Sequence, residues 1–171
     1  EIKFMKETVE LLIDRNETIA TMESCTGGGV ANAITNVPGA SGIIKYSAVT
    51  YSNEYKIKMG VPEEVIAKFT VYSKETAIAM ARTISAFANA DYGVGVTGRF
   101  GVIDPANPGG ETDLVYISIY DRANNKDNIF IVRSLDAERS ENKELVISEV
   151  NARVSEILRK KNETKTLKRT R

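Results

Sequence analysis

The chain of 171 residues contains no histidine and only one cysteine, Cys25. Without histidine, Ser-His-Asp and Cys-His catalysis are excluded, so a hydroxyl nucleophile would need another base, for which lysine is the usual substitute. The same absence excludes a zinc site built from histidine and cysteine ligands. A single cysteine cannot form an intrachain disulfide, so the sequence does not support secretion.

The sequence also lacks a long apolar run. No stretch approaches the about 18 residues of a membrane-spanning helix, and the first seven residues mix charge into their apolar positions, unlike a signal peptide. We therefore expect a cytoplasmic protein that has no membrane partner.

Charge is divided unevenly along the chain, although 23 basic and 23 acidic residues balance overall. Seven basic residues but only one acidic residue, Glu163, lie in residues 159–171, which leaves an acidic excess before them. An acidic body is a poor surface for nucleic acid, so we expect no such partner. Residues 162–171 are interpreted as a basic tail that could be disordered, and a solvated helix end or an expression remnant explains it better than a polyanion site.

The periodicity of the apolar residues indicates one α/β domain over residues 1–161. Helices are predicted near residues 5–13, 26–37, 53–58, 62–69, 73–88 and 137–161, and strands near 18–22, 43–51, 92–97, 114–120 and 128–133. Glycine alternates with larger residues in 92–97, which predicts that a neighbouring element packs closely on that strand. This order favours a three-layer α/β/α sandwich with a mixed sheet and a late hairpin.

In open sheets of this kind the ligand lies beyond the carboxyl ends of the strands. Three such ends are predicted here: Ser24, Tyr51 and the pair Thr97-Gly98. These ends direct the search for a functional site.

The first end reads Glu-Ser-Cys-Thr-Gly-Gly-Gly over residues 23–29. A strand that turns there into a helix exposes unpaired N–H groups at the positive end of the helix dipole, and such a corner can hold an anion or an oxyanion. Ser24 is the candidate nucleophile. The alternative is that Ser24 and Thr26 only cap the helix while the glycines permit close packing.

The second end reads Thr-Tyr-Ser-Asn-Glu-Tyr-Lys over residues 50–56. With Ser52 as N-cap, Lys56 falls in the first turn of a helix, where the dipole and partial burial would favour the neutral amine. A neutral Lys56 could act as a base, and Tyr51 could donate its hydroxyl. The alternative is that Lys56 and Lys58 are ordinary surface lysines.

These two motifs, together with Pro-Gly-Ala-Ser at residues 38–41, resemble the C-terminal domain of the CinA family (competence/damage-inducible proteins) over about residues 4–160. That family includes stand-alone nicotinamide-nucleotide amidases. The resemblance implies hydrolysis of the carboxamide of nicotinamide mononucleotide, with Ser24 as nucleophile, Lys56 as base and Tyr51 as supporting hydroxyl. It implies a phosphorylated nucleotide as partner, no cofactor or metal, and a homo-oligomer.

In the mechanism that we expect, N–H groups of Thr26, Gly27 and Gly28 hold the oxyanion. Cys25 is a rival nucleophile, but without a histidine partner we interpret it as a small core residue next to the site.

The third family motif, Ser/Thr-Gly-x-x-Gly-Pro-x-Gly-Gly, is altered here. The chain keeps Thr97, Gly98 and Gly101, but its Gly-Gly pair arrives only at residues 109–110. Since such a loop would lie against the substrate, Arg99 within it could restore an anion contact.

Arg139 resembles a family arginine, and it too could bind the substrate anion. The altered loop leaves two other functions open. One is a binding module for a nucleotide or sugar phosphate that has lost turnover, and the other is an interaction protein that works through the basic tail.

Overall fold

The computed structural model describes residues 2–102 and 104–169, with side chains from Met5 onward. Its centre is a five-stranded sheet in the order β2-β1-β3-β4-β5. Strands β1 (Ile19–Glu23), β2 (Ile44–Val49) and β3 (Tyr92–Gly98) run parallel, while β4 (Leu114–Asp121) and β5 (Lys126–Arg133) form an antiparallel hairpin. The predicted mixed sheet and late hairpin are therefore confirmed.

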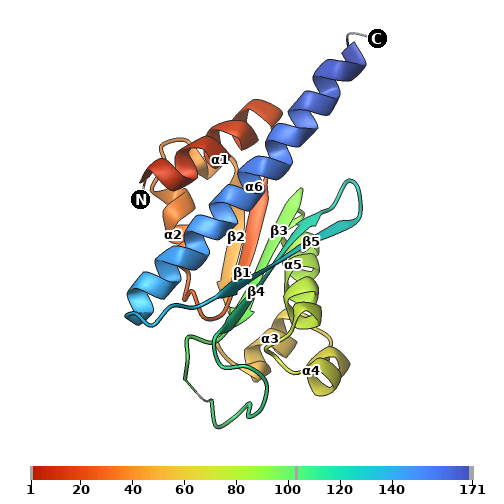
Figure 1. The fold of residues 1–171 in the computed structure, drawn as a ribbon. Helices are drawn as coiled ribbons and strands as arrows, with labels where there is room; N and C mark the ends of the chain where they lie inside the picture. The colour runs from red at the N-terminus through yellow and green to blue at the C-terminus, as the bar shows by residue number, and fades with distance from the viewer. Residues whose placement is uncertain (1, 103, 170–171) are drawn as a thin grey trace.

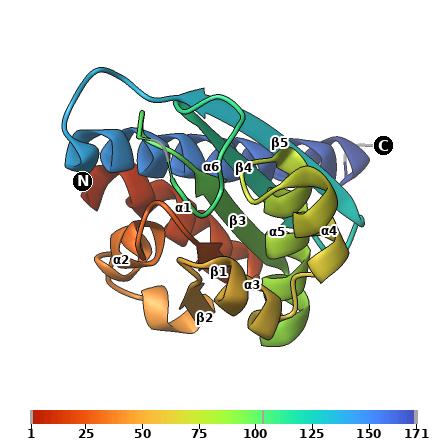
Figure 2. The same ribbon diagram turned by 90° about the horizontal axis from the view of Figure 1, so that it is seen from below.

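Helices cover both faces of this sheet, which gives the three layers seen in Figures 1 and 2. One face carries α1 (Ile2–Arg15), α2 (Gly29–Thr35) and α6 (Arg139–Arg169); the other carries α3 (Asn53–Met59), α4 (Glu63–Phe69) and α5 (Lys74–Ala88). Each face buries its own apolar cluster, the larger one beneath α1, α2 and α6. The predicted α/β/α sandwich is the fold observed.

The glycines of β3 allow α5 to lie directly on the sheet. A Cβ atom at Gly93 would stand 2.0 Å from the carbonyl oxygen of Ala81, and one at Gly95 would stand 2.3 Å from that of Ala77. Both distances are far below van der Waals contact, so only glycine fits at these positions. The close packing predicted from the alternating glycines is confirmed.

Two helix boundaries differ from the predictions. The second helix begins at Gly29 instead of near Thr26, because Gly27 and Gly28 have φ of 60° and 92° and form a turn that is not helical. The last helix continues to Arg169, so residues 162–169 of the predicted tail extend α6.

The start of the basic region is also paired with the acidic body. Arg159 pairs with Glu7, and Lys160 pairs with Glu156 one turn earlier on the same helix. Part of the uneven charge in the sequence is therefore neutralised within the fold.

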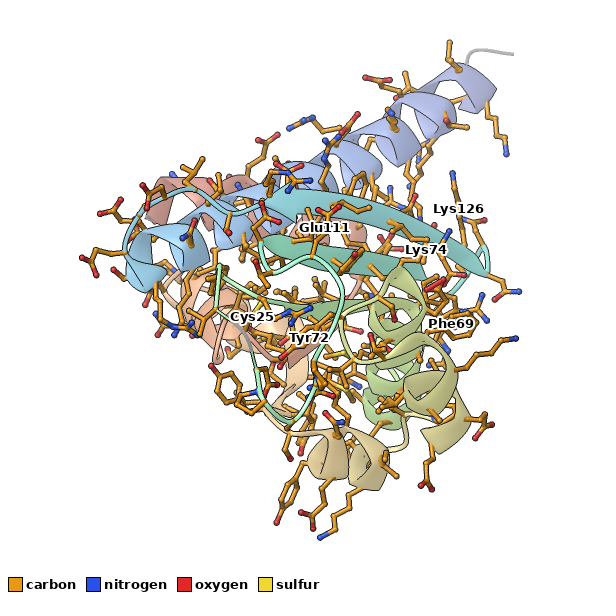
Figure 3. The ribbon with its side chains drawn as sticks, turned by 60° about the horizontal axis from the view of Figure 1, so that its bottom comes forward. Cys25, Phe69, Tyr72, Lys74, Glu111 and Lys126 are labelled. Atoms are coloured by element: carbon orange, nitrogen blue, oxygen red, sulfur yellow. The ribbon has the colours of Figure 1, made fainter. Side chains whose placement is uncertain are left out.

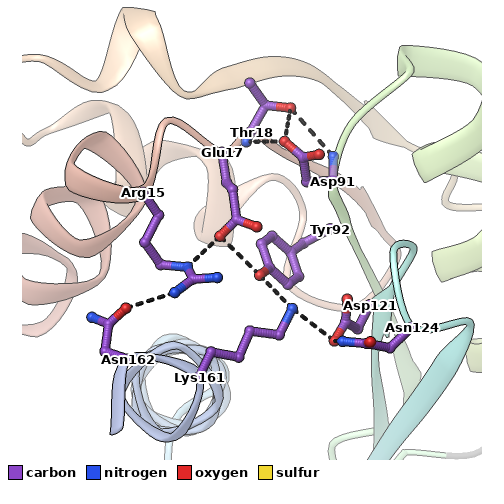
Figure 4. A network of polar contacts seen from close by, with 9 residues as sticks. All are labelled: Arg15, Glu17, Thr18, Asp91, Tyr92, Asp121, Asn124, Lys161 and Asn162. Atoms are coloured by element: carbon purple, nitrogen blue, oxygen red, sulfur yellow. Dashed lines mark hydrogen bonds and ion pairs between the residues drawn. The ribbon is translucent and has the colours of Figure 1, made fainter. Parts of the chain in front are cut away.

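A polar network lies at the opposite end of the sheet from the carboxyl ends of β1, β2 and β3 (Figure 4). Glu17 accepts hydrogen bonds from Arg15 and from the hydroxyl of Tyr92, the latter at 3.0 Å. Lys161 of α6 reaches the same hydroxyl at 2.8 Å and forms an ion pair with Asp121 at 2.8 Å. The network attaches α6 to the start of β3 and to the end of β4.

Candidate active site

The ends of β1 and β2 meet because the two strands are parallel neighbours. Glu23 pairs with Val49 in the sheet, and the N–H of Thr50 donates to the carbonyl oxygen of Glu23 at 2.8 Å. The chain then turns at Ser24 after β1 and enters α3 after β2. The two sequence motifs are thus brought side by side by strand register.

Ser24 and Lys56 contact each other at this junction. The Nζ atom of Lys56 lies 3.2 Å from Ser24 Oγ and donates a second hydrogen bond to the carbonyl oxygen of Thr50 at 2.8 Å. Lys56 is only 2% exposed and Ser24 is 7% exposed. The predicted approach of the two side chains is confirmed, and the alternative that Lys56 is a surface lysine is wrong.

Lys58 shows what a surface lysine on the same helix looks like. Its side chain is 58% exposed and forms an ion pair of 2.7 Å with Glu54. Ser52 caps the helix as predicted, since its Oγ accepts a hydrogen bond from the N–H of Tyr55 at 3.2 Å. The short helix therefore turns one lysine inward and one outward.

Burial changes the acid–base character of two ionisable neighbours of Ser24, Lys56 and Cys25. Desolvation lowers the pKa of Lys56 to about 8, against a smaller opposing effect of nearby negative charge, including that of Asp104. At pH 7 about a tenth of the molecules would then carry the neutral amine. Desolvation raises the pKa of the Cys25 thiol to about 12, so Cys25 is a protonated core residue and a poor nucleophile.

Glu23, which the sequence interpretation passed over, occupies the start of α2. Its buried carboxylate accepts hydrogen bonds from the hydroxyls of Thr21 (3.1 Å) and Thr26 (2.7 Å). It also accepts from the N–H groups of Val30 (2.8 Å) and Ala31 (3.0 Å). The N–H groups in the first turn of α2, which were expected to bind an external anion, therefore hold the chain's own carboxylate, and this corrects that part of the prediction.

The Thr26–Gly28 turn uses only some of its N–H groups. Gly27 donates to the carbonyl oxygen of Ser24 at 2.9 Å, and Gly29 donates to that of Thr26 at 3.0 Å. Within the described part of the chain, the N–H groups of Thr26 and Gly28 have no hydrogen-bond partner. Of the three residues predicted to hold an oxyanion, Thr26 and Gly28 thus keep a free donor and Gly27 does not, and none of the three lines either of the hollows at Ser24.

Ser24 lies between two hollows of the surface, of about 370 Å³ and about 360 Å³. Four residues border both of them: Ser24, Tyr51, Tyr72 and Asp104. The first hollow is completed by Cys25, Gly98, Arg99, Phe100, Val102, Pro105 and Arg139. In Figure 3, Cys25 and Tyr72 lie beneath the loop that follows β3, which forms one wall of the cleft.

Tyr51 lies at the rim of this cleft. Its side chain is 63% exposed, and its hydroxyl accepts a hydrogen bond from Arg139 at 3.2 Å. The Arg139 guanidinium also stacks over the ring of Phe100, at 5.4 Å from the ring centroid. Tyr51 and Arg139 therefore border the site as predicted, and the free Arg139 face is accessible from solvent.

At the third strand end, two predicted substrate contacts are directed elsewhere. Thr97 is fully buried and donates from Oγ1 to the carbonyl oxygen of Val71 at 2.7 Å, so it holds the segment before α5. Gly101 donates from its N–H to the carbonyl oxygen of Thr112 at 2.6 Å and does not line either hollow. Only Gly98 of this trio lines the cleft.

Arg99 is only 5% exposed, and most of its contacts are to its own loop. Its guanidinium stacks over the ring of Tyr72 at 4.2 Å and donates to the carbonyl oxygens of Asn107 (3.4 Å) and Gly109. The Nε atom of Arg99 is buried and has no hydrogen-bond partner among the described residues. Arg99 thus holds this loop together, and its guanidinium has little capacity left for a substrate anion.

The residues of the cleft that sequence reasoning missed include Tyr72, Phe100 and Asp104. Tyr72 belongs to a segment without any motif, and Asp104 interrupts a motif instead of matching one. In the described chain, no group of three acidic or cysteine side chains could hold a metal ion, and no described helix has the length and apolar character to cross a bilayer.

Comparison with known proteins agrees with the motifs. The family model described as CinA C-terminal domain matches residues 1–158. This chain belongs to the CinA family. It is 40% identical over 126 residues to a putative competence-damage inducible protein of Clostridium botulinum, and 44% identical over 113 residues to a CinA-like protein of Endomicrobium trichonymphae. The first alignment covers 70% of this chain and 29% of the Clostridium protein. The second covers 66% of this chain and 26% of the Endomicrobium protein.

Solved structures of CinA-type proteins match nearly the whole chain. The competence/damage inducible protein CihA of Agrobacterium tumefaciens superposes with a TM-score of 0.80 at 28% identity, covering 90% of this chain and 92% of that one. A competence or damage-inducible protein of Enterobacter asburiae superposes with a TM-score of 0.83 at 23% identity, covering 92% and 97%. The second likeness shows the CinA fold alone.

Proposed function

We propose that this CinA-type chain is an amidohydrolase that converts nicotinamide mononucleotide to nicotinate mononucleotide and ammonia. The observation that carries the proposal is the buried contact of 3.2 Å between Lys56 Nζ and Ser24 Oγ, at a lysine whose pKa is lowered to about 8. A buried amine next to a hydroxyl at a strand end is how a serine is activated without histidine. The family resemblance of the two motifs supplies the substrate.

Catalysis begins with neutral Lys56. Its amine accepts the Ser24 proton while Oγ attacks the carboxamide carbon, and the carbonyl oxygen becomes an oxyanion. The free N–H groups of Thr26 and Gly28 are the donors that the turn offers to this oxygen. The Thr50 carbonyl accepts one amine hydrogen and so turns the amine lone pair toward Ser24.

The intermediate then breaks its carbon–nitrogen bond. Ammonia leaves with the proton that Lys56 had accepted, and an ester to Ser24 remains. Lys56, neutral again, takes a proton from water as the water oxygen attacks the ester carbon. Collapse of this second intermediate breaks the ester bond, returns the proton to Ser24 Oγ and releases the carboxylic acid.

Arg139 is the proposed contact of the substrate phosphate. It is exposed at the cleft rim, while Arg99 is occupied by loop carbonyls. A guanidinium suits a phosphate because it offers paired N–H donors in one plane. Tyr51, which holds Arg139 through its hydroxyl, supports this contact.

The test is ammonia release from nicotinamide mononucleotide by the whole chain. We expect turnover in the wild type, and a loss of at least about 10³-fold in Ser24→Ala and in Lys56→Met. Lys58→Met is the matched control, since it removes an exposed amine two residues away and should leave the rate unchanged. Activity that survives in Ser24→Ala would refute the proposal.

A non-catalytic binding module is the second candidate, and the altered loop favours it because Arg99 organises a wall that the family builds from glycines. This function predicts that nicotinamide mononucleotide raises the melting temperature of the wild type without releasing ammonia.

A further inference from the structure

Asp104 is the only carboxylate, among the described residues, that borders both hollows at Ser24. Glu54 lines the second hollow, but its side chain is 64% exposed and paired with Lys58. Asp104 is half-buried, and its charge is felt at Lys56, where it opposes the lowering of the lysine pKa. A negative charge therefore stands in the cleft within electrostatic reach of the reacting groups.

This carboxylate is held firmly. Oδ2 accepts hydrogen bonds from the Tyr72 hydroxyl (2.7 Å) and from Asn107 Nδ2 (3.0 Å), and Oδ1 accepts from the N–H of Ala106 (3.0 Å). Asn107 is fixed in turn by a reciprocal amide pair with Asn53 at the start of α3, at 2.8 and 3.2 Å. The orientation of Asp104 is thus set before any ligand binds.

The charge of Asp104 is not neutralised by an ion pair with any described residue. The hydrogen bonds from Asn107, Tyr72 and Ala106 lower the pKa of the carboxyl, so it is ionised at neutral pH. Arg99 acts on it only at longer range, because its guanidinium stacks on Tyr72 and donates to loop carbonyls. An ordered carboxylate that forms no ion pair with a described residue is suited to a cationic ligand.

We propose that Asp104 determines specificity by selecting amides attached to a cationic ring, as in an N-ribosylated pyridinium, over neutral aromatic amides. This inference rests on the proposed function. In nicotinamide mononucleotide the positive ring nitrogen lies meta to the carboxamide. When the carboxamide carbon contacts Ser24 Oγ, the ring must extend into the cleft whose walls include Tyr72 and Asp104.

The same contacts allow a simpler role, in which Asp104 only ties its loop to Tyr72 and Asn107. The two roles differ in one measurable respect. If Asp104 only fixes the loop, its loss should change kcat/KM equally for every substrate. If it contacts the substrate charge, its loss should lower kcat/KM for a cationic substrate and leave that of the neutral isostere unchanged. The effect of Asp104 on Lys56 also acts on both substrates alike and cancels from their ratio.

The experiment compares nicotinamide mononucleotide with benzamide riboside monophosphate, in which carbon replaces the charged ring nitrogen. We expect the ratio of kcat/KM values, cationic over neutral, to fall about tenfold in Asp104→Asn, the size expected for one partly screened charge contact. Asp104→Glu should restore most of the preference. Tyr72→Phe is the matched control, because it removes one hydrogen bond to Asp104 but keeps the charge, and it should leave the ratio unchanged.

Binding provides a second readout that does not need turnover. Calorimetry in a Ser24→Ala background should show the same tenfold fall in the ratio of the two Kd values. If the wild type hydrolyses neither compound, the proposed function fails. The ratio of the two Kd values still tests the role of Asp104 in that case. In Asp104→Asn, the new amide could repel the N–H of Ala106 and displace the loop. If it does, Asp104→Ala is measured in its place. Equal losses for both compounds would overturn the inference.

Discussion

The Nζ atom of Lys56 lies 2.8 Å from the carbonyl oxygen of Thr50, the residue at which the chain leaves β2. This contact and the one to Ser24 place a lysine amine in the interior, where the chain offers it no carboxylate partner among the described residues. The free energy of unfolding and the reactivity of the site therefore both depend on whether Lys56 carries a proton.

Lys56→Met should stabilise the protein while it abolishes activity. In the native state the pKa of Lys56 is about 8, below the ordinary lysine value of 10.5, so the folded protein is penalised whenever the lysine is protonated. The penalty is complete below pH 8 and disappears as the pH rises toward 10.5. We expect denaturant unfolding at pH 7 to give about 1–3 kcal/mol more stability in the variant, with the difference shrinking above pH 8.

An equal or lower stability of Lys56→Met at pH 7 would contradict this expectation. Lys58→Met serves as control, because its amine is exposed and its removal should change the stability by less than about 0.5 kcal/mol.

Glu23→Ala should weaken the fold at the Ser24 corner. The change leaves the N–H groups of Val30 and Ala31 without their acceptor inside the protein. We expect a loss of about 2–4 kcal/mol in urea unfolding, together with a fall in kcat. Glu10→Ala, on the exposed face of α1, should cost no more than about 0.5 kcal/mol. Similar losses in the two variants would show that the buried carboxylate does not organise the corner.

Gly95→Ala should prevent normal folding. The added methyl group would stand 2.3 Å from the Ala77 carbonyl oxygen and 2.7 Å from the Ala81 nitrogen, so α5 would have to leave the sheet. Thermal unfolding followed by circular dichroism measures the effect. The same change at Gly42 meets nothing within 4 Å and should leave the melting temperature nearly unchanged. A stable Gly95→Ala protein would mean that α5 does not pack on β3 as described.

Lys161→Met should destabilise the far end of the sheet, because it leaves the buried Asp121 carboxylate without its cation (Figure 4). We expect a cost of about 2–4 kcal/mol at pH 7. Although burial acts to raise the pKa of Asp121, hydrogen bonds from Lys161 and Asn124 lower it overall. The pair therefore stabilises the fold above about pH 4, and this contribution is lost as the pH falls through the lowered pKa.

The cost of Lys161→Met should accordingly shrink in acid, which unfolding measurements at pH 7 and pH 3 would reveal. Lys160→Met, whose amine is 71% exposed, should show neither the cost nor its pH dependence. A cost that is the same at both pH values would contradict the account.

The sequence was sufficient to predict the fold, whereas the contact between Ser24 and Lys56 was implied by their assigned roles and is seen only in the structure. Apolar periodicity identified every strand, and Ser52 caps the helix that it was expected to cap. Parallel neighbouring strands then require that the two motifs lie at the same edge of the sheet. The elements depend on local pattern, which a single sequence contains, whereas the pairing of β1 with β2 was not predicted and is seen only in the structure.

Contacts that depend on three-dimensional packing could not be predicted. Glu23 could not be recognised as the acceptor for α2, because its partners lie seven and eight residues away and on the far side of a turn. Arg99 was expected to face a substrate anion, but its orientation depends on loop carbonyls and on Tyr72, which no motif connects to it. Thr97 was turned away from the cleft by a carbonyl of residue 71.

The central claim, that the neutral amine of Lys56 activates Ser24, is tested most directly by the pH dependence of kcat/KM for nicotinamide mononucleotide. Since the base must be unprotonated, the account predicts a rate that rises tenfold per pH unit in acid and levels off with an apparent pKa near 8. A rate that stays level between about pH 6 and pH 9 would contradict it.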